Sequence, residues 1–77
     1  MIDIYSLESG ATYVVNKAFT DYHGNVFAVG ETLTYVENHF LPYHGGHTVV
    51  FRERKLYLQE ELNSDIINAF AEYFSRA

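Results

Sequence analysis

The stretch that decides the fold is TVVFRERKLYLQ, residues 48–59. Val49 and Phe51 alternate with outward-facing neighbours before a short polar turn, and Leu56 and Leu58 alternate in the same way after it. A period of two is typical of a strand with one buried face. Because so few residues separate the two strands, we predict an antiparallel hairpin.

Further strands are predicted upstream. Residues 11–19 are rich in β-branched and aromatic side chains, and residues 32–36 alternate again. Between them, residues 21–25 gather turn-forming residues, so we expect the chain to reverse there. Residues 37–47 are predicted to form a loop.

The C-terminus changes to a helical period, and one helix is predicted over about residues 63–75. Asn63 is the expected N-cap, and Leu62 is placed to pack on Ile67 as a hydrophobic staple. The predicted apolar face, which should dock on the sheet, consists of Ile66, Ile67, Phe70, Tyr73 and Phe74.

These elements predict a mainly β fold, namely a small SH3-like, partly open antiparallel barrel of four or five strands capped by one helix. A plain α+β sheet with one helix is the alternative. Residues 1–77 should form a single domain, since 77 residues leave room for one core. The aromatic residues expected in that core are Phe19, Phe27, Phe51, Phe70 and Phe74.

Composition narrows the classes of function. Ten Asp and Glu stand against five Lys and Arg, a net charge of −5, which argues against direct nucleic-acid binding. There is no cysteine and no apolar run long enough to cross a membrane. The first residues do not resemble a signal peptide, so we expect a cytoplasmic protein.

Several short motifs together resemble a known family. They are D-x-H-G-N-x-F at residues 21–27, G-E-x-L at 30–33, F-L-P-Y-x-G-G-H-T at 40–48, L-Q-E-E at 58–61 and Y-F at 73–74. This pattern is similar to that of a small bacterial family, domain of unknown function number 3601. The resemblance implies an SH3-like architecture and no assigned reaction.

Histidines in the segment 41–49 raise the question of a metal site. The candidate ligands are His44, His47 and His39, to which His23 and Asp21 could be added from another loop. A metal site needs three or four converging ligands, and a loop H-x-x-H does not fix their convergence. Pro42 and the Gly45–Gly46 pair instead indicate a tight turn. We therefore predict a turn and no cofactor.

No residue pattern typical of an enzyme is present. His47 is expected to be a buried structural residue that orients the loop by a hydrogen bond to backbone. Glu31 or Asp21 could partner a catalytic histidine, but no spacing supports either choice. The chain is accordingly expected to be non-enzymatic.

Two kinds of side chain suggest protein binding. An aromatic group could rim a groove for an extended peptide, with Tyr43 and Tyr57 expected at the surface; the alternative is that most of these rings belong to the core. That group consists of Tyr22, Tyr35, Phe40, Tyr43 and Tyr57.

Acidic side chains give the alternative. The C-terminal third of the chain is acidic and contains Glu60, Glu61, Asp65 and Glu72. They are either a solvated face or a patch that blocks a basic partner, as an inhibitor or immunity-type protein does. An open sheet edge would also allow a homodimer or added peptide strand, unless Lys17, Arg52 and Lys55 protect it. Overall, we predict a protein-interaction domain with binding residues Tyr43, His44, His47, Tyr57, Glu60 and Glu61.

Overall fold

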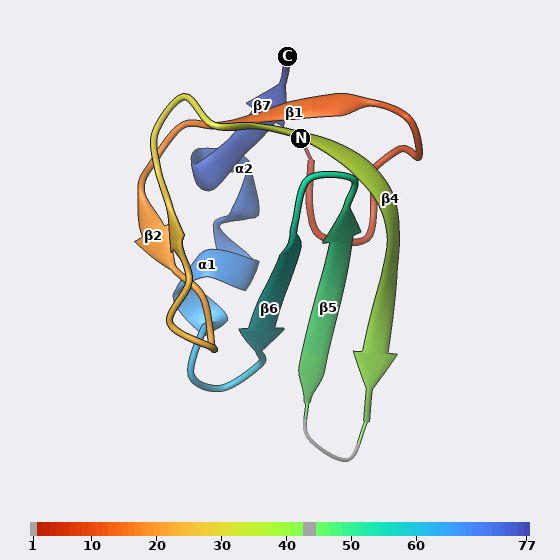
Figure 1. The fold of residues 1–77 in the computed structure, drawn as a ribbon. Coiled ribbons are helices and arrows are strands. Elements are labelled where there is room, and N and C mark those ends of the chain that lie inside the picture. The colour runs from red at the N-terminus through yellow and green to blue at the C-terminus, as the bar shows by residue number, and fades with distance from the viewer. Residues whose placement is uncertain (1, 43–44) are drawn as a thin grey trace.

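The computed structural model describes residues 2–42 and 45–77 and contains seven strands and two short helices within them (Figure 1). In chain order these are β1 Thr12–Val15, β2 Phe19–Thr20, β3 Val26–Phe27, β4 Thr32–Leu41, β5 Gly46–Phe51, β6 Lys55–Gln59, α1 Ser64–Asn68, α2 Phe70–Tyr73 and β7 Phe74–Arg76. No helix in the described ranges is long and apolar enough to cross a membrane.

The strands form two antiparallel sheets. The larger has the order β6-β5-β4-β1-β7, and β2 pairs with β3 in a small second sheet. The predicted antiparallel, mainly β class is confirmed, and so is the hairpin of β5 and β6, in which Val49 pairs with Leu56. The barrel prediction is corrected, because the described strands form an open sheet that does not close. Its end strands β6 and β7 do not meet; the segment around Asp21 lies against the outer edge of β6 instead.

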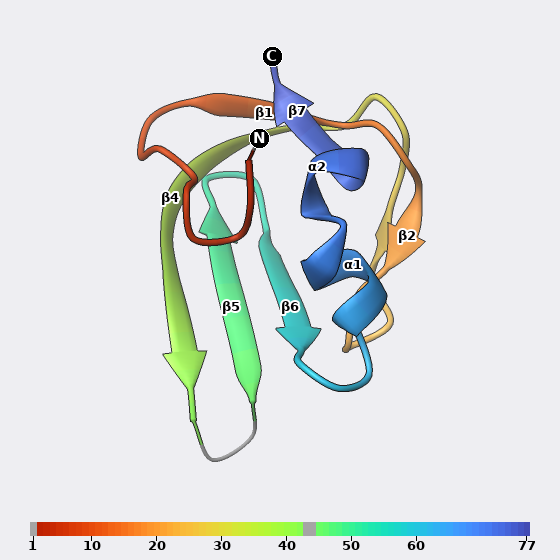
Figure 2. The ribbon, with the colours of Figure 1, turned by 180° about the vertical axis from the view of Figure 1, so that it is seen from behind.

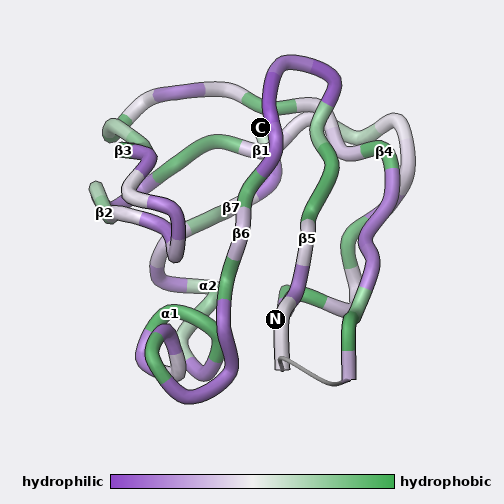
Figure 3. The backbone as a smooth tube through the Cα atoms, turned by 60° about the horizontal axis from the view of Figure 1, so that its bottom comes forward, coloured by the Kyte–Doolittle hydropathy of each residue, from purple (hydrophilic) through white to green (hydrophobic). Residues whose placement is uncertain are grey.

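Alternation along the strands builds the core. Leu33 and Tyr35 on β4, Val49 on β5 and Leu56 and Leu58 on β6 are all buried, as their spacing predicts. Figure 3 shows hydrophobic and more polar residues alternating along β6. The five phenylalanines expected in the core are also buried there: Phe19, Phe27, Phe51, Phe70 and Phe74.

The prediction of a loop over residues 37–47 is wrong. β4 continues to Leu41 and β5 begins at Gly46, so the two strands pair over most of this segment. A register shift between Tyr35 and Glu37 explains the error. The extra residue, Val36, interrupts the alternation, so the polar stretch that follows lacks the period of a continuing strand.

The single helix over 63–75 is also corrected. α1 ends at Asn68, α2 covers only Phe70–Tyr73, and Phe74 is extended, where β7 begins to pair with β1. Pairing with β1 satisfies backbone groups that a continued helix would satisfy internally, and it still buries Phe74. Figure 2 shows α1 and α2 between β6 and the β2–β3 hairpin.

The expected start of the helix differs in the same region. Asn63 makes no side-chain cap; its Oδ1 accepts a hydrogen bond from the Gln59 N–H at 2.9 Å. Leu62 is 72% exposed and therefore does not act as a staple on Ile67. Asn63 thus closes the end of β6 rather than the start of α1.

Asp21 docks the turn between β2 and β3 onto β6. Its buried carboxylate accepts N–H groups of His23 at 3.0 Å and Asn25 at 2.8 Å within the turn. It also accepts the Tyr57 N–H at 3.1 Å, while the Tyr22 N–H donates to the Tyr57 carbonyl at 2.8 Å. The outer edge of β6 is therefore bonded at Tyr57.

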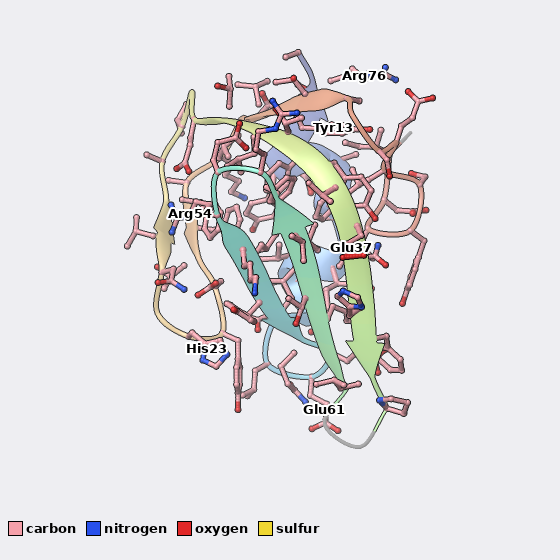
Figure 4. All side chains as sticks on the ribbon, turned by 45° about the vertical axis from the view of Figure 1, so that its right-hand side comes forward. Tyr13, His23, Glu37, Arg54, Glu61 and Arg76 are labelled. Carbon is pink, nitrogen blue, oxygen red and sulfur yellow. The ribbon has the colours of Figure 1, made fainter. Side chains whose placement is uncertain are left out.

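Arg54 holds the other end of the β2–β3 hairpin. Its guanidinium lies 3.9 Å from the centroid of the Phe27 ring, donates to the Val26 carbonyl and pairs with Glu31 at 3.1 Å. Figure 4 shows Arg54 beside this hairpin. The small sheet is thus attached to the β5–β6 hairpin at both of its ends.

Replacing Asp21 with alanine should destabilise the fold. The change leaves the Tyr57 N–H and the turn N–H groups without their acceptor, and we expect a loss of about 2–3 kcal/mol. Urea unfolding measures it. Asp3→Ala is the matched control, since Asp3 accepts the Tyr5 N–H in an exposed turn. Equal losses in the two variants would contradict the anchoring role of Asp21.

Glu53 should make stability depend on pH. Its carboxylate accepts the Thr34 N–H at 2.8 Å, and this bond is the main reason that the pKa of Glu53 lies below its ordinary value of 4.5. A lowered pKa in the folded state adds stability above that value and loses it as pH falls. Glu53→Gln should therefore be less stable than the wild type at about pH 7 and nearly equal to it at about pH 3. Urea unfolding at both values checks this, and a constant difference would contradict it.

Candidate functional site

A groove lies on the face of the β5–β6 hairpin that points away from the core. It encloses a volume of about 340 Å³. Four segments line it: the end of β4, the first half of β5, the end of β6 and the turn after β2. The lining residues are Tyr22, His23, Leu41, Gly46, His47, Thr48, Tyr57, Leu58 and Gln59.

Three rings form one wall of the groove. The His23 ring contacts Tyr57 edge to face at a centroid distance of 4.4 Å and Tyr22 at 5.4 Å. Tyr22 is 50% exposed. Figure 4 shows His23 at the end of the loop that follows β2. The Asp21 bonds position this wall, because they hold the backbone of Tyr22 and His23 against β6.

The side of the groove opposite this wall, formed by residues of β4 and β5, is more open. Leu41, more than half exposed, pairs across the strands with Gly46, and Thr48 pairs with Tyr57. A Cβ atom added to Gly46 would meet no atom of the described residues within 4 Å, so these residues leave the groove unfilled above Gly46. An aromatic wall beside an open apolar and hydroxyl-bearing floor can bind a side chain or a stretch of extended peptide.

His47 is buried at the edge of the core. Its ring lies between Phe40, at a centroid distance of 4.7 Å, and Tyr5, at 5.7 Å, and Nε2 is 3.3 Å from a carboxylate oxygen of Glu60. Only 4% of His47 is exposed. It is a structural histidine as predicted, but its partner is a carboxylate rather than the backbone.

The predicted binding residues therefore do not form one site. Tyr57 and His47 line the groove, Glu60 bonds to His47, and Glu61 is exposed beyond the end of β6. Tyr43 and His44 lie outside the described residues.

The aromatic residues predicted to rim a groove also lie in different places. Tyr35 is buried in the core, where burial first and the charge of Glu37 second raise its pKa. Phe40 packs on His47. Tyr22 stays in the groove and is joined by His23 and Leu41, which were not predicted as binding residues. The signal for His23 was its place in the turn motif after Asp21.

Those candidate metal ligands that the structure describes do not converge. Asp21 accepts N–H groups, His39 pairs with Glu37 at 3.4 Å, and His47 pairs with Glu60. Within residues 2–42 and 45–77, no three His, Asp or Glu side chains form a group that could hold a metal ion.

Comparisons with known proteins place the fold. No curated protein matches the chain. A solved integron cassette protein from the mobile metagenome of Vibrio cholerae is similar, with a TM-score of 0.88 and 23% identity over 92% of this chain and 88% of that chain. At this identity the likeness shows the fold alone. The family model described as Domain of unknown function (DUF3601) matches residues 3–76, so the resemblance is confirmed and the chain belongs to that family.

Proposed function

We propose that the chain is a non-enzymatic protein-interaction domain of the bacterial cytoplasm, and that the groove binds an extended segment of a partner protein. The observation that carries this proposal is the wall of Tyr22, His23 and Tyr57. Rings brought together from two distant segments, one half exposed, form a rigid apolar surface with hydroxyl groups at its rim. SH3 domains bind peptides in aromatic-lined grooves, and here a comparable aromatic surface lies on an open sheet of different architecture.

The chemistry of the wall indicates the kind of segment it accepts. Tyrosine faces favour aliphatic side chains and also cations, which interact with the electron-rich ring. The carboxylates of Glu60 and Glu61 lie just beyond Gln59, which lines the groove. A partner segment with a large apolar residue next to Lys or Arg would use both features.

Changing the wall should weaken binding without unfolding the domain. Tyr22→Ala removes a half-exposed ring, and we expect at least about tenfold lower affinity for a peptide selected on the wild type from a random library. Isothermal titration measures it. Tyr5→Ala is the matched control, because Tyr5 is 69% exposed and its ring packs on His47 rather than beside Tyr57.

A second variant fills the groove instead of removing a wall. Gly46→Val places a branched side chain where a Cβ meets no neighbour among residues 2–42 and 45–77, and valine suits a strand. We expect it to lose binding while keeping its unfolding midpoint. Amide shift changes that avoid Tyr22, His23, Thr48 and Tyr57 on peptide addition would refute the groove as the binding site.

An acidic inhibitor or immunity-type protein remains the second candidate. The exposed acids Glu60, Glu61 and Asp65 follow one another beyond β6, and no Lys or Arg occurs between residues 55 and 76. Such a patch would attract a basic toxin or nucleic-acid-handling protein by charge complementarity. Binding that is lost at high salt and survives Tyr22→Ala would favour this candidate over the groove.

A further inference from the structure

The second half of β4 has a strand on one side only. β5 pairs with it from Glu37 to Leu41, whereas β1 pairs with residues 32–34 and reaches no further. Figures 1 and 2 both show this part of β4 at the outer edge of the sheet, with no strand of the described chain beyond it. Ser9 Oγ donates to the Val36 carbonyl where the free edge begins.

Backbone groups of Asn38 and Phe40 point to this free edge. Tyr57 uses its N–H and carbonyl on the outer side of β6, so its partner Thr48 directs its own groups toward β4. Thr48 pairs with His39, which therefore bonds toward β5. Because neighbouring residues alternate, Asn38 and Phe40 face outward.

The free edge also carries exposed apolar side chains, and its backbone is less protected than that of the opposite edge, β6. Val36, Phe40 and Leu41 on β4 are all more than two-fifths exposed. On β6, by contrast, the turn after β2 occupies Tyr57, and Asn63 bonds to Gln59. An unpaired edge with exposed apolar side chains is a template for pairing with a strand of another chain.

We propose that a second copy of this chain covers the edge, through antiparallel pairing of residues 36–40 with the same residues of the partner. With the two-fold axis at Asn38, Glu37 lies opposite the partner's His39, and Val36 lies opposite the partner's Phe40. The segment is therefore complementary to itself in both polar and apolar contact, because a carboxylate faces an imidazole that can donate a hydrogen bond to it. Within one chain, Glu37 and His39 already share one face of β4, with 3.4 Å between Glu37 Oε2 and His39 Nε2.

Other registers are worse on the same criteria. A two-fold axis at Glu37 opposes two carboxylates, and an axis at His39 opposes two imidazoles and places Glu37 against Leu41. Like charges directly opposite destabilise a strand pair. Of these three axes, only the one at Asn38 places a carboxylate opposite an imidazole.

The pairing predicts a weak, symmetric dimer. Five residues and a few apolar side chains bury less area than stable interfaces do, so dissociation should fall in the micromolar to millimolar range. The two sheets would become continuous, with both grooves on the same face. This inference does not depend on what the groove binds.

Sedimentation equilibrium over micromolar to millimolar concentrations tests the dimer. Glu37→Lys should weaken it about tenfold, and Glu37→Lys with His39→Glu should restore it, since lysine then faces the partner's glutamate. Glu72→Lys is the control with the same charge change on α2, and it should leave the dimer unchanged. A chain that stays monomeric throughout the range overturns the proposal.

Phe40→Pro tests the edge directly. It removes an N–H that points outward, which the monomer does not use for pairing with β5, so the variant should fold and should not dimerise. Circular dichroism confirms folding. If Phe40→Pro does not fold, Glu37→Lys and its combination with His39→Glu test the dimer in its place. If Phe40→Pro folds and still dimerises, pairing through β4 is overturned.

Cysteine cross-linking tests the register. The chain has no cysteine, so Asn38→Cys, Glu37→Cys and His39→Cys each carry one thiol. Directly opposite residues lie about 5.5 Å apart between Cα atoms, which a disulfide spans. With an added oxidant, cross-linking should be greatest at position 38, and a maximum at 37 or 39 would overturn the register.

Discussion

The carboxylate of Asp21 is the constraint on which the rest of the structure depends. It lies in the turn of the small sheet, yet it accepts the Tyr57 N–H on the edge of the large one. A buried carboxylate is tolerated only when its oxygens are bonded, and here four donors bond to it. The Asp21 side chain thereby stabilises its own turn and also joins the small sheet to the large one.

This arrangement explains why the sheet is open and why the groove exists. With the edge of β6 occupied by the turn after β2, that strand cannot continue a barrel. The docked turn raises Tyr22 and His23 beside Tyr57, which creates a wall that no single strand could provide. Core and groove are thus separated by the β5–β6 hairpin, with apolar residues on one face and the groove on the other.

The outer edge of β6 and the edge of β4 beyond Val36 differ in how their backbone groups are satisfied. β6 has its outward groups bonded within the chain, while β4 beyond Val36 presents backbone and apolar side chains together. Interaction through the groove and pairing through β4 would therefore use different surfaces of the same sheet. Lys17, Arg52 and Lys55, expected to protect an open edge, are not on this part of β4.

Period-two patterns determined much of the fold without any tertiary information. The β5–β6 hairpin, the burial of Val49, Leu56 and Leu58, and the turn at residues 21–25 all follow from local rules that depend on near neighbours. The structural role of His47 was also predictable, because it continues the buried face of β5. The family resemblance rested on the same turn glycines and core residues.

Long-range contacts decided the rest. The bulge at Val36 hid the continuation of β4, and the helical segment ends at Tyr73 because Phe74 pairs with β1. The groove combines residues 22 and 57, which no spacing rule connects. A hydrogen bond between Asp21 and Tyr57 spans 36 positions. Sequence alone determined which residues favour strands and turns; only the folded chain decided which turn meets which edge, because that choice depends on satisfying every buried polar group at once.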